Sequence, residues 1–499
     1  MTAPRITHSE NARQWVHVAS GLFALLLRVL NGWQAAALAA GAVVFNVALL
    51  PHVGGRRLYR PEDVTRGFPL GILLYPLSVL LLMLAFPHRL DIAAAAWGIL
   101  AFGDGFATLV GRRGRQATAE HAKIAENDEH SDRSITVERS RTGKAAEAAG
   151  NAENTYPSAI SAHSAVASGR IPWNRDKSIA GTTAFIICGS AAGVALAWWV
   201  RPSVVPVPPL MFAIAAPIAA AVLAALAETV PVRLDDNITV PATAAVVLWI
   251  ASLMTAASVD AASHAVVAAL PWAVGVNAAT GWLGYRARTV SRSGAVAGAV
   301  VGAIIYIGGG PAAWVLLLAT FLAASVTSRL GLGRKERLGI AEERGGRRGA
   351  GNAIANCGVA AMAAIAAVTT PYQTVALAAL VAALTAGGSD TVASEIGKAW
   401  GRSTFLVTTL RRVPPGTAGA MSIEGTVAGL IGAFVLAGSG AALGLISGSA
   451  IALVVAAATA GALIESALGA TLEGPGILNN DMLNFINTAA AAAVVIAFA

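Results

Sequence analysis

Long apolar stretches alternate with shorter polar ones along most of the chain. Several stretches approach or exceed the roughly 20 residues that an α-helix needs to cross a bilayer, among them 67–86, 182–200, 210–226 and 425–464. The pattern predicts an all-α polytopic membrane protein. The composition agrees with it, because 12% of the residues are charged, against about 25% in an average soluble domain.

The basic residues are concentrated in a few polar segments, and these segments set the expected topology. Lys and Arg cluster within 56–66, 112–177, 286–292, 329–348 and 398–412. Positively charged loops stay on the cytoplasmic side of a membrane. About 15 helices can be threaded so that every basic segment falls on that side. This predicts a cytoplasmic N-terminus, an external C-terminus and, as the favoured location, a bacterial inner membrane.

A pattern of polar residues occurs twice, in the same order. Asp104 in "GDGFATLVGR" and Asp390 in "SDTVASEIGK" are each followed by Ala at +3, Gly at +7 and a basic residue at +8. Each is followed by a Ser-Ile-x-Gly-Thr element, at 178–182 and 422–426, and by a third polar block, at 225–247 and 462–495. Three blocks in one order are improbable by chance in a Gly-rich chain. We therefore predict two modules, 1–256 and 285–499, as parallel repeats of about seven helices joined by a bridging helix over 257–284.

The two aspartates and the two Ser-Ile-x-Gly-Thr elements are candidates for chemistry. A carboxylate in a membrane helix is costly and is by default a functional candidate, the alternative being a packing or capping role. The elements place Ser178 and Ser422 at helix starts, as N-caps. A helix N-terminus with a Gly binds phosphate well. Each element is therefore either a phosphate-binding site or an ordinary helix cap, and the sequence leaves both possibilities open. The residues of this prediction are Ser178, Gly181, Ser422 and Gly425, with Lys177 as a nearby cation.

The second copy has Met421 where the first has Lys177, so its cation must come from elsewhere. The segment "EERGGRRGAGN" offers Arg344, Arg347 and Arg348 as a clamp for a di- or triphosphate; a positive-inside anchor is the alternative. The two cysteines, Cys188 and Cys357, lie in apolar stretches and indicate no disulfide or metal site. Any metal chemistry must therefore use oxygen ligands.

The third blocks supply such oxygens. They hold Glu228, Asp235, Asp236 and Asn237 in the first module, and Glu465, Asn480, Asp481 and Asn484 in the second. Carboxylate and amide oxygens suit Mg²⁺ together with phosphate oxygens, and helix capping or loop solvation is the alternative. Positioning and charge neutralisation are the main requirements of phosphoryl transfer. The lipid setting suggests a second substrate with a polar head and a long apolar tail.

These residues resemble known families. The first module resembles the phytol, dolichol and polyprenol kinase family over nearly all of 10–256, through "RQWVHVASG", "AFGDGFATLVGRRG", "WNRDKSIAGTTAF" and "DDNITVPATAA". The second is similar to the phytyl-phosphate kinase family of integral membrane proteins over 285–499, through "LGIAEERGGRRGAGNAIAN", "SDTVASEIGKAWGR" and "NNDMLNFIN". No loop of the soluble kinases is present in the sequence.

The resemblance implies a bifunctional kinase. It would convert an isoprenoid alcohol (phytol, geranylgeraniol or farnesol) to the monophosphate and then to the diphosphate, with CTP or ATP as donor, Mg²⁺ as cofactor and no nucleic-acid partner. Catalytic roles fall on Asp104, Asp236 and Asp390. Metal ligands would be Asp104, Asp235, Asp236, Asn237, Asp390, Glu395, Asp481 and Asn484. The nucleotide would be held by Lys177, Ser178, Gly181, Arg344, Arg347, Arg348, Lys398, Ser422 and Gly425.

One departure and three alternatives stay open. The polar segment 113–170 is longer than the connection usual in the resembled family, and its composition predicts a disordered cytoplasmic insert, either an expanded loop or a lid. The function alternatives are a cytidylyltransferase that forms a CDP-lipid, a lipid carrier or flippase without chemistry, and a chain in which one module is degenerate and purely structural.

Overall fold

The computed structural model describes residues 10–50, 52, 70–112, 169–171, 174–230, 235–340 and 347–499. They form two compact units, the first ending at Trp249 and the second running from Ile250 to Ala499. Most of the predicted insert 113–170 lies outside the described residues, and so does Arg344.

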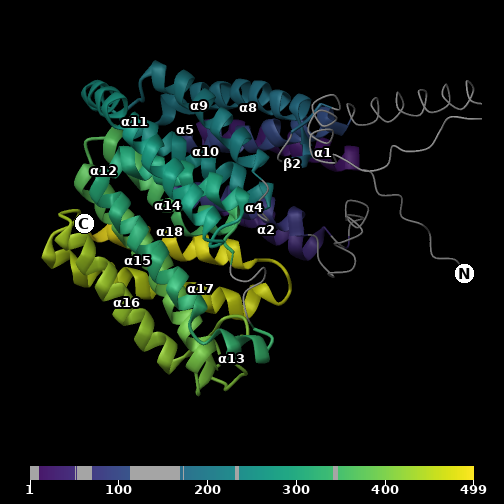
Figure 1. Cartoon of the computed structure of the whole chain (residues 1–499). Helices are drawn as coiled ribbons and strands as arrows, with labels where there is room; N and C mark the ends of the chain where they lie inside the picture. The colour runs from purple at the N-terminus through teal and green to yellow at the C-terminus, as the bar shows by residue number, and fades with distance from the viewer. Residues whose placement is uncertain are drawn as a thin grey trace, which may run out of the picture. The chain divides into compact units, whose positions relative to one another are not determined.

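The first unit is built of helices and one short antiparallel hairpin (Figure 1). Its elements are α1 (Glu10–Ser20), η1 (Gly21–Arg28), α2 (Gly32–Val44), η2 (Phe45–Leu49), α4 (Leu70–Ala85), α5 (Leu90–Gly98), η4 (Ile99–Asp104), β1 (Arg170–Ile171), β2 (Asn174–Ser178), α8 (Ile179–Val200), η5 (Arg201–Ser203), α9 (Leu210–Thr229) and α10 (Asp236–Leu253). The helix that begins with α5 and passes through η4 continues to Arg112.

The centre of the first unit is the α5–η4 helix. Every residue of α5 is buried, and four of its nine residues are alanines. A Cβ added at Gly98 would lie 2.6 Å from a Leu196 side-chain carbon, and one at Gly103 would lie 3.0 Å from the Phe185 ring. Small residues allow helices to approach closely in a membrane protein. This packing against α8 places the next residue, Asp104, inside the unit.

The second unit has the same kind of construction. Its elements are α11 (Ala256–Arg286), α12 (Arg292–Arg329), α13 (Leu332–Arg337), α14 (Ala350–Thr369), α15 (Gln373–Trp400), β3 (Thr404–Leu406), β4 (Ala420–Ser422), α16 (Ile423–Ala442), η7 (Gly448–Ala450), α17 (Ile451–Leu468), η8 (Gly469–Glu473) and α18 (Asn480–Phe498). The predicted bridging segment 257–284 lies within α11, which packs on α12 and α14 of this unit.

Helix α15 is the core of the second unit. It packs against α12, α14, α16, α17 and α18, and several of these helices run side by side in Figure 1. Residues 378–389 of α15 are buried without interruption, and most are Ala, Gly or Leu. Because α15 has protein on every side along this stretch, Asp390 directly after it is held within the helix bundle.

Helix α12 is two helices joined at a bend. Its 38 residues would be about 57 Å long if straight, far more than the roughly 30 Å hydrocarbon core. The bend is at Gly310, where φ is 73° and ψ is −178°, a conformation that is essentially restricted to Gly. Pro311 follows and starts the second half.

The prediction of an all-α membrane protein is confirmed. Among the described residues, twelve helices are long and apolar enough to cross a membrane, Gly71–Ala85 is apolar but shorter, and the strands form only two short hairpins. The total of about 15 crossings stays a prediction, because it depends on α4, on α1 with η1, and on the two halves of α12. The parallel orientation of the repeats also stays a prediction.

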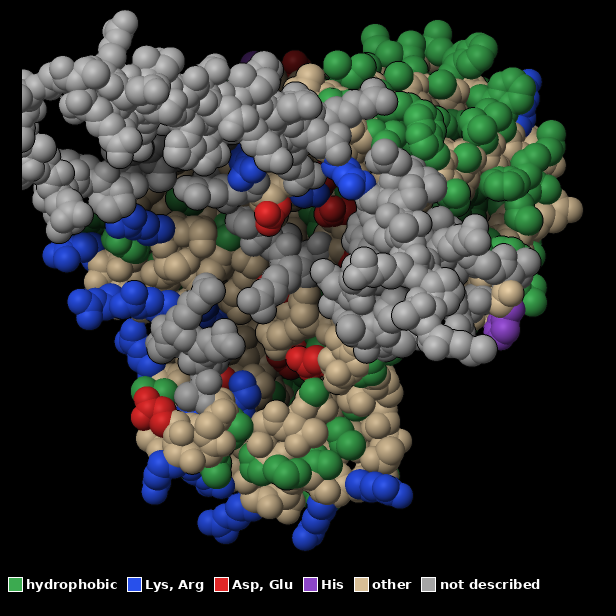
Figure 2. All heavy atoms as spheres, turned by 90° about the vertical axis from the view of Figure 1, so that its right-hand side faces the viewer, with side chains coloured by type: hydrophobic (Ala, Val, Ile, Leu, Met, Phe, Trp, Pro, Cys, Tyr) green, Lys and Arg blue, Asp and Glu red, His purple; other side chains and the backbone are tan. Residues whose placement is uncertain are grey.

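Basic side chains gather on one part of the second unit. Figure 2 shows Lys and Arg concentrated on its lower part, around α13 of Figure 1. Arg337 on α13 is exposed, and so are Arg402, Arg411 and Arg412 around β3. These residues belong to the predicted basic segments 329–348 and 398–412, whose cytoplasmic location stays a prediction.

Candidate active sites

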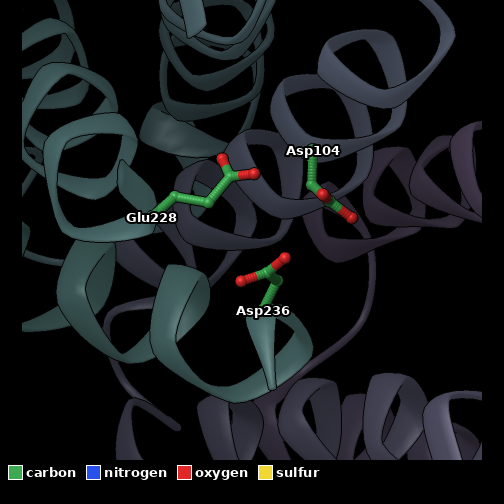
Figure 3. A group of neighbouring side chains, drawn as sticks. All are labelled: Asp104, Glu228 and Asp236. Carbon is green, nitrogen blue, oxygen red and sulfur yellow. The ribbon is translucent and has the colours of Figure 1, made fainter. Parts of the chain in front are cut away.

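Three carboxylates converge in the first unit. Asp104 at the end of η4, Glu228 at the end of α9 and Asp236 at the start of α10 point toward one another (Figure 3). Their ligand oxygens lie within 4.8 Å of one another, and Asp104 is only 9% exposed. His17 approaches from α1, with Nε2 3.7 Å from Asp104 Oδ2. Three acids at such distances repel one another unless a cation is present.

Lys177 supplies a cation to this group. Its Nζ donates to Asp236 Oδ2 at 2.9 Å and also to Glu228. Burial lowers the pKa of Lys177, but the charges of Asp236 and Glu228 outweigh burial and raise it above its usual value. The ammonium group therefore stays charged. The hairpin that holds it is tied to α9, because Asn174 Nδ2 donates to the Thr229 carbonyl oxygen at 3.2 Å.

Asp235 and Asn237 bind each other beside this group. Asp235 Oδ1 accepts from the backbone N–H of Asn237 at 2.9 Å and from its Nδ2 at 2.8 Å. Asp235 is therefore a local cap of α10 and is not one of the three converging acids. Its predicted ligand role stays a prediction. Asn237 Oδ1 is buried without a hydrogen-bond partner among the described residues, which leaves it available as an oxygen donor.

Ser178 and Ser422 are N-caps, as predicted, but their oxygens are occupied. Ser178 Oγ accepts from Gly181 N at 3.1 Å, and Ser422 Oγ accepts from Gly425 N at 3.0 Å. A Cβ at Gly181 would lie 3.0 Å from the carbonyl oxygen of Ala107. A Cβ at Gly425 would lie 2.5 Å from the carbonyl oxygen of Ala393. Both elements are thus helix caps packed against a neighbouring helix. Their predicted role in phosphate binding stays a prediction.

The second unit has a smaller polar group between α15, α17 and α18. Asp390 and Glu465 interact electrostatically, and Asn487 lies beside Glu465. Asn487 is fully buried, and its contact with Glu465 does not meet the criteria of a hydrogen bond. Both polar atoms of Asn487 and Oε2 of Glu465 therefore lack partners within the described residues. Buried polar atoms without partners indicate that something polar binds there.

Glu395, a predicted metal ligand, is a structural residue. Its Oε2 accepts from Lys335 Nζ at 2.5 Å, and its Oε1 accepts from Lys398 Nζ at 3.2 Å. Lys335 also donates to the Ser328 carbonyl oxygen at 2.7 Å. Glu395 and Lys335 are 2% and 1% exposed. Both oxygens of Glu395 are occupied by lysines, so we correct the prediction of a metal ligand for Glu395. The nucleotide contact of Lys398 stays a prediction.

The remaining candidates lie at two helix starts. Arg347 is exposed, and Arg348 is half-buried next to α14 with its Nη2 3.4 Å from Ser328 Oγ. Asp481 is in the first turn of α18, and Asn484 is buried one turn further. Asn487 is on the same helix as Asn484 but was not predicted. Lys335 was not predicted either, because its segment "GRKER" reads as an ordinary basic loop.

Comparisons with known proteins concern part of the chain. The integral membrane protein family DUF92 matches residues 275–492. An uncharacterised membrane protein of Synechocystis is 42% identical over 200 residues, which are 40% of this chain and 78% of the relative. The chloroplastic protein VTE6 of Arabidopsis thaliana is 37% identical over 208 residues, 40% of this chain and 62% of VTE6. An uncharacterised membrane protein of Methanocaldococcus jannaschii is 31% identical over 203 residues, 41% of this chain and 83% of the relative. No solved structure matches the chain.

Proposed function

The chain belongs, through residues 275–492, to the DUF92 family of integral membrane proteins, and we propose that its second unit is a prenyl-phosphate kinase. The resemblance of 285–499 to the phytyl-phosphate kinase family supports this, and the similarity to VTE6 agrees with it. We further propose that the first unit phosphorylates the prenyl alcohol. The chain would then make an isoprenoid monophosphate and convert it to the diphosphate, with CTP or ATP as donor.

The observation that most strongly supports chemistry in the first unit is the meeting of three acids and one lysine. Oxygen ligands on opposite sides of Mg²⁺ lie about 4.2 Å apart, close to the 4.8 Å limit within which the three carboxylates meet. Asp104, Glu228 and Asp236 therefore fit a magnesium ion, and Asn237 Oδ1 is a further donor nearby. When bound, Mg²⁺ would neutralise charge on the nucleotide phosphates.

Other steps of the reaction would fall to side chains of the first unit, namely removal of the proton of the alcohol and contact with the phosphate. The acceptor is a neutral alcohol, so its proton must leave, and Asp104 or Asp236 is positioned to take it. Lys177 bonds two carboxylates in the absence of ligand. A cation on these carboxylates would free the ammonium group to contact a phosphate oxygen. A lysine serves such a contact as a point charge.

Phosphoryl transfer in the second unit would require fewer catalytic groups than in the first. Its acceptor is already an anionic phosphate and requires no strong base. Asp390, Glu465 and Asn487 offer oxygens for a cation, which fits the predicted magnesium requirement. Arg348 and Arg347 stand at the start of α14 as positive partners for phosphate.

The test is a product assay with the purified full-length protein in detergent. The protein is incubated with Mg²⁺, geranylgeraniol and CTP or ATP labelled at the γ-phosphate. We expect labelled monophosphate first and diphosphate later, with release of the nucleoside diphosphate. Replacement of Mg²⁺ by EDTA should abolish both products.

Two results would contradict the proposal. Release of pyrophosphate together with a CDP-lipid would identify a cytidylyltransferase. Absence of any nucleotide consumption, with movement of a labelled prenyl phosphate across vesicles, would identify a carrier. A γ-label in the lipid product excludes the first of these, and product formation in detergent excludes the second.

A further inference from the structure

The second unit contains a cavity that the chemistry above does not use. Its volume is about 160 Å³, and it is lined by residues of α11, both halves of α12, α14 and α15. Glycines, alanines and large apolar residues such as Leu317 and Phe321 form most of its wall. A wall of this kind favours an apolar ligand over a polar one, because polar groups would lose their hydration without gaining partners.

The two ends of the cavity differ in character. At one end are Arg348 and Asn352, at the start of α14. Arg348 is fixed by its backbone, whose N–H donates to the Thr289 carbonyl and whose carbonyl accepts from Ser291 N, each at 3.0 Å. At the other end, Trp314 Nε1 donates to Asn277 Oδ1 at 3.0 Å. This bond links α12 to α11 and places two polar side chains at this end of the apolar space.

The cavity also borders the proposed catalytic acid. Gly387 and Thr391, which precede and follow Asp390 on α15, are both in its wall. Asn356 of α14 is in the wall too, and a Cβ at Gly387 would lie 3.1 Å from Asn356 Oδ1. Helix α14 lines the cavity from Gly349 to Cys357, a span of about 12 Å at 1.5 Å per residue, so the cavity is at least this long.

We propose that this cavity binds the isoprenoid chain of the monophosphate substrate, with the phosphate at the Arg348 end and the Trp314–Asn277 pair as the limit on chain length. The inference rests on the proposed prenyl-phosphate kinase activity of this unit. Arg348 selects an anionic head and the apolar wall selects a hydrocarbon tail. The space is small, about 160 Å³, which favours a single hydrocarbon chain over the two acyl chains of a phospholipid.

The test fills the cavity without disturbing its wall. A Cβ at Gly298 would have no atom within 4 Å, and Gly298 lines the cavity. Gly298→Leu therefore places an isobutyl group in the space. The matched control is Gly438→Leu on α16, where a Cβ also meets no atom within 4 Å and which is not in the cavity wall.

The readout is equilibrium binding of labelled geranylgeranyl monophosphate and of the shorter geranyl monophosphate to the full-length protein. We expect Gly298→Leu to weaken binding of the longer ligand about tenfold or more and to leave the shorter one within about threefold of wild type. Gly438→Leu should bind both like wild type. Arg348→Gln should weaken both ligands by a similar factor, because the head is common to them.

Binding is measured separately from phosphoryl transfer so that the two proposals can fail independently. Equal binding by Gly298→Leu and wild type would overturn the cavity assignment even if diphosphate forms. Failure of wild type to bind either ligand, or displacement of geranylgeranyl monophosphate by phosphatidate at equal affinity, would also overturn it. Loss of binding in Gly298→Leu would support the cavity assignment even if wild type transfers no phosphate, and the kinase proposal alone would then fail.

Discussion

The two units share a helix contact almost atom for atom. Ser178 has φ −115° and ψ 148°, and Ser422 has φ −116° and ψ 153°. A Cβ at Gly111 would lie 3.1 Å from Ser178 Oγ, and one at Gly397 2.8 Å from Ser422 Oγ. In each unit the capping serine ends an antiparallel hairpin. The repeated sequence element therefore forms the same local contact in both units, and the arrangement of the whole chain as two repeats stays a prediction.

The polar groups attached to that scaffold differ. The first unit brings three acids to Lys177, whereas the second has Met421 in place of Lys177 and a pair of acids beside Asn487. The second unit also has Glu395, which is paired with two lysines. Glu395 is five residues after Asp390, and the residue five after Asp104 in the first unit is Leu109. The comparison teaches that the capped helix contact is common to both units while the charged groups differ, as expected if one acceptor is neutral and the other anionic.

The largest expected effect comes from removing one acid at a time. Asp104→Asn should lower monophosphate formation from geranylgeraniol by about 10²–10⁴-fold, because it removes a candidate base and metal ligand. Asp390→Asn should instead let the monophosphate accumulate. Both are measured by separating lipid products over time. Diphosphate formation by Asp390→Asn from added monophosphate would break the proposed division between the units.

The next effect concerns the ion pair found only in the second unit. Lys335→Met leaves Glu395 buried with one weaker partner and should lower the free energy of unfolding by about 3–5 kcal/mol. The double change Lys335→Met with Glu395→Leu should recover most of this, since Leu109 occupies the matching position in the first unit. Thermal unfolding in detergent measures both. The control is Arg337→Met, an exposed site on the same helix, and an equal loss there would refute the role of the pair.

Lys177→Met makes the first unit resemble the second. We expect phosphorylation of the alcohol to fall by about 10²–10³-fold, because a fixed charge next to the phosphate is lost. Phosphorylation of added monophosphate by the same protein should stay unchanged, which serves as an internal control. Equal loss of both steps would mean that Lys177 supports folding of the whole chain, not the first reaction.

The smallest effect should be the same in both units. Ser178→Ala and Ser422→Ala each remove one cap and should cost about 1 kcal/mol of stability, with both reactions retained. Unfolding curves and product assays are compared for the pair. A drop of about tenfold or more in kcat without loss of stability would support phosphate binding by the serines.

Much of the scaffold could be predicted from the sequence. Apolar stretches of bilayer length predicted the helices, because length and hydropathy are local properties. Ser178 and Ser422 were predicted as caps for the same reason, since capping depends on residues three apart. The positions of Asp104 and Asp390 in buried helix interiors also followed from the Gly and Ala residues around them.

The composition of the sites could not be predicted in the same way. Glu228 and Glu465 stood in polar blocks with several other candidates, and only the packing of α9 and α17 showed that they face Asp104 and Asp390. Lys335 was hidden because a buried lysine and a loop lysine have the same local sequence. Glu395 was predicted as a ligand because its contacts depend on tertiary packing. In the structure α13 packs on α15, and the carboxylate of Glu395 accepts hydrogen bonds from Lys335 of α13 and from Lys398 of its own helix.

The bend in α12 has a consequence for which changes the second unit tolerates. The bend at Gly310 determines which side chains of the following helix face the interior of the unit. Insertion of one residue after Gly310 would rotate that helix by about 100°. Leu316 and Thr320, which are buried, would then turn from the interior toward lipid, and the hydrogen bond from Trp314 to Asn277 would be lost. This segment should therefore accept many substitutions that preserve its size, but no change in the number of its residues.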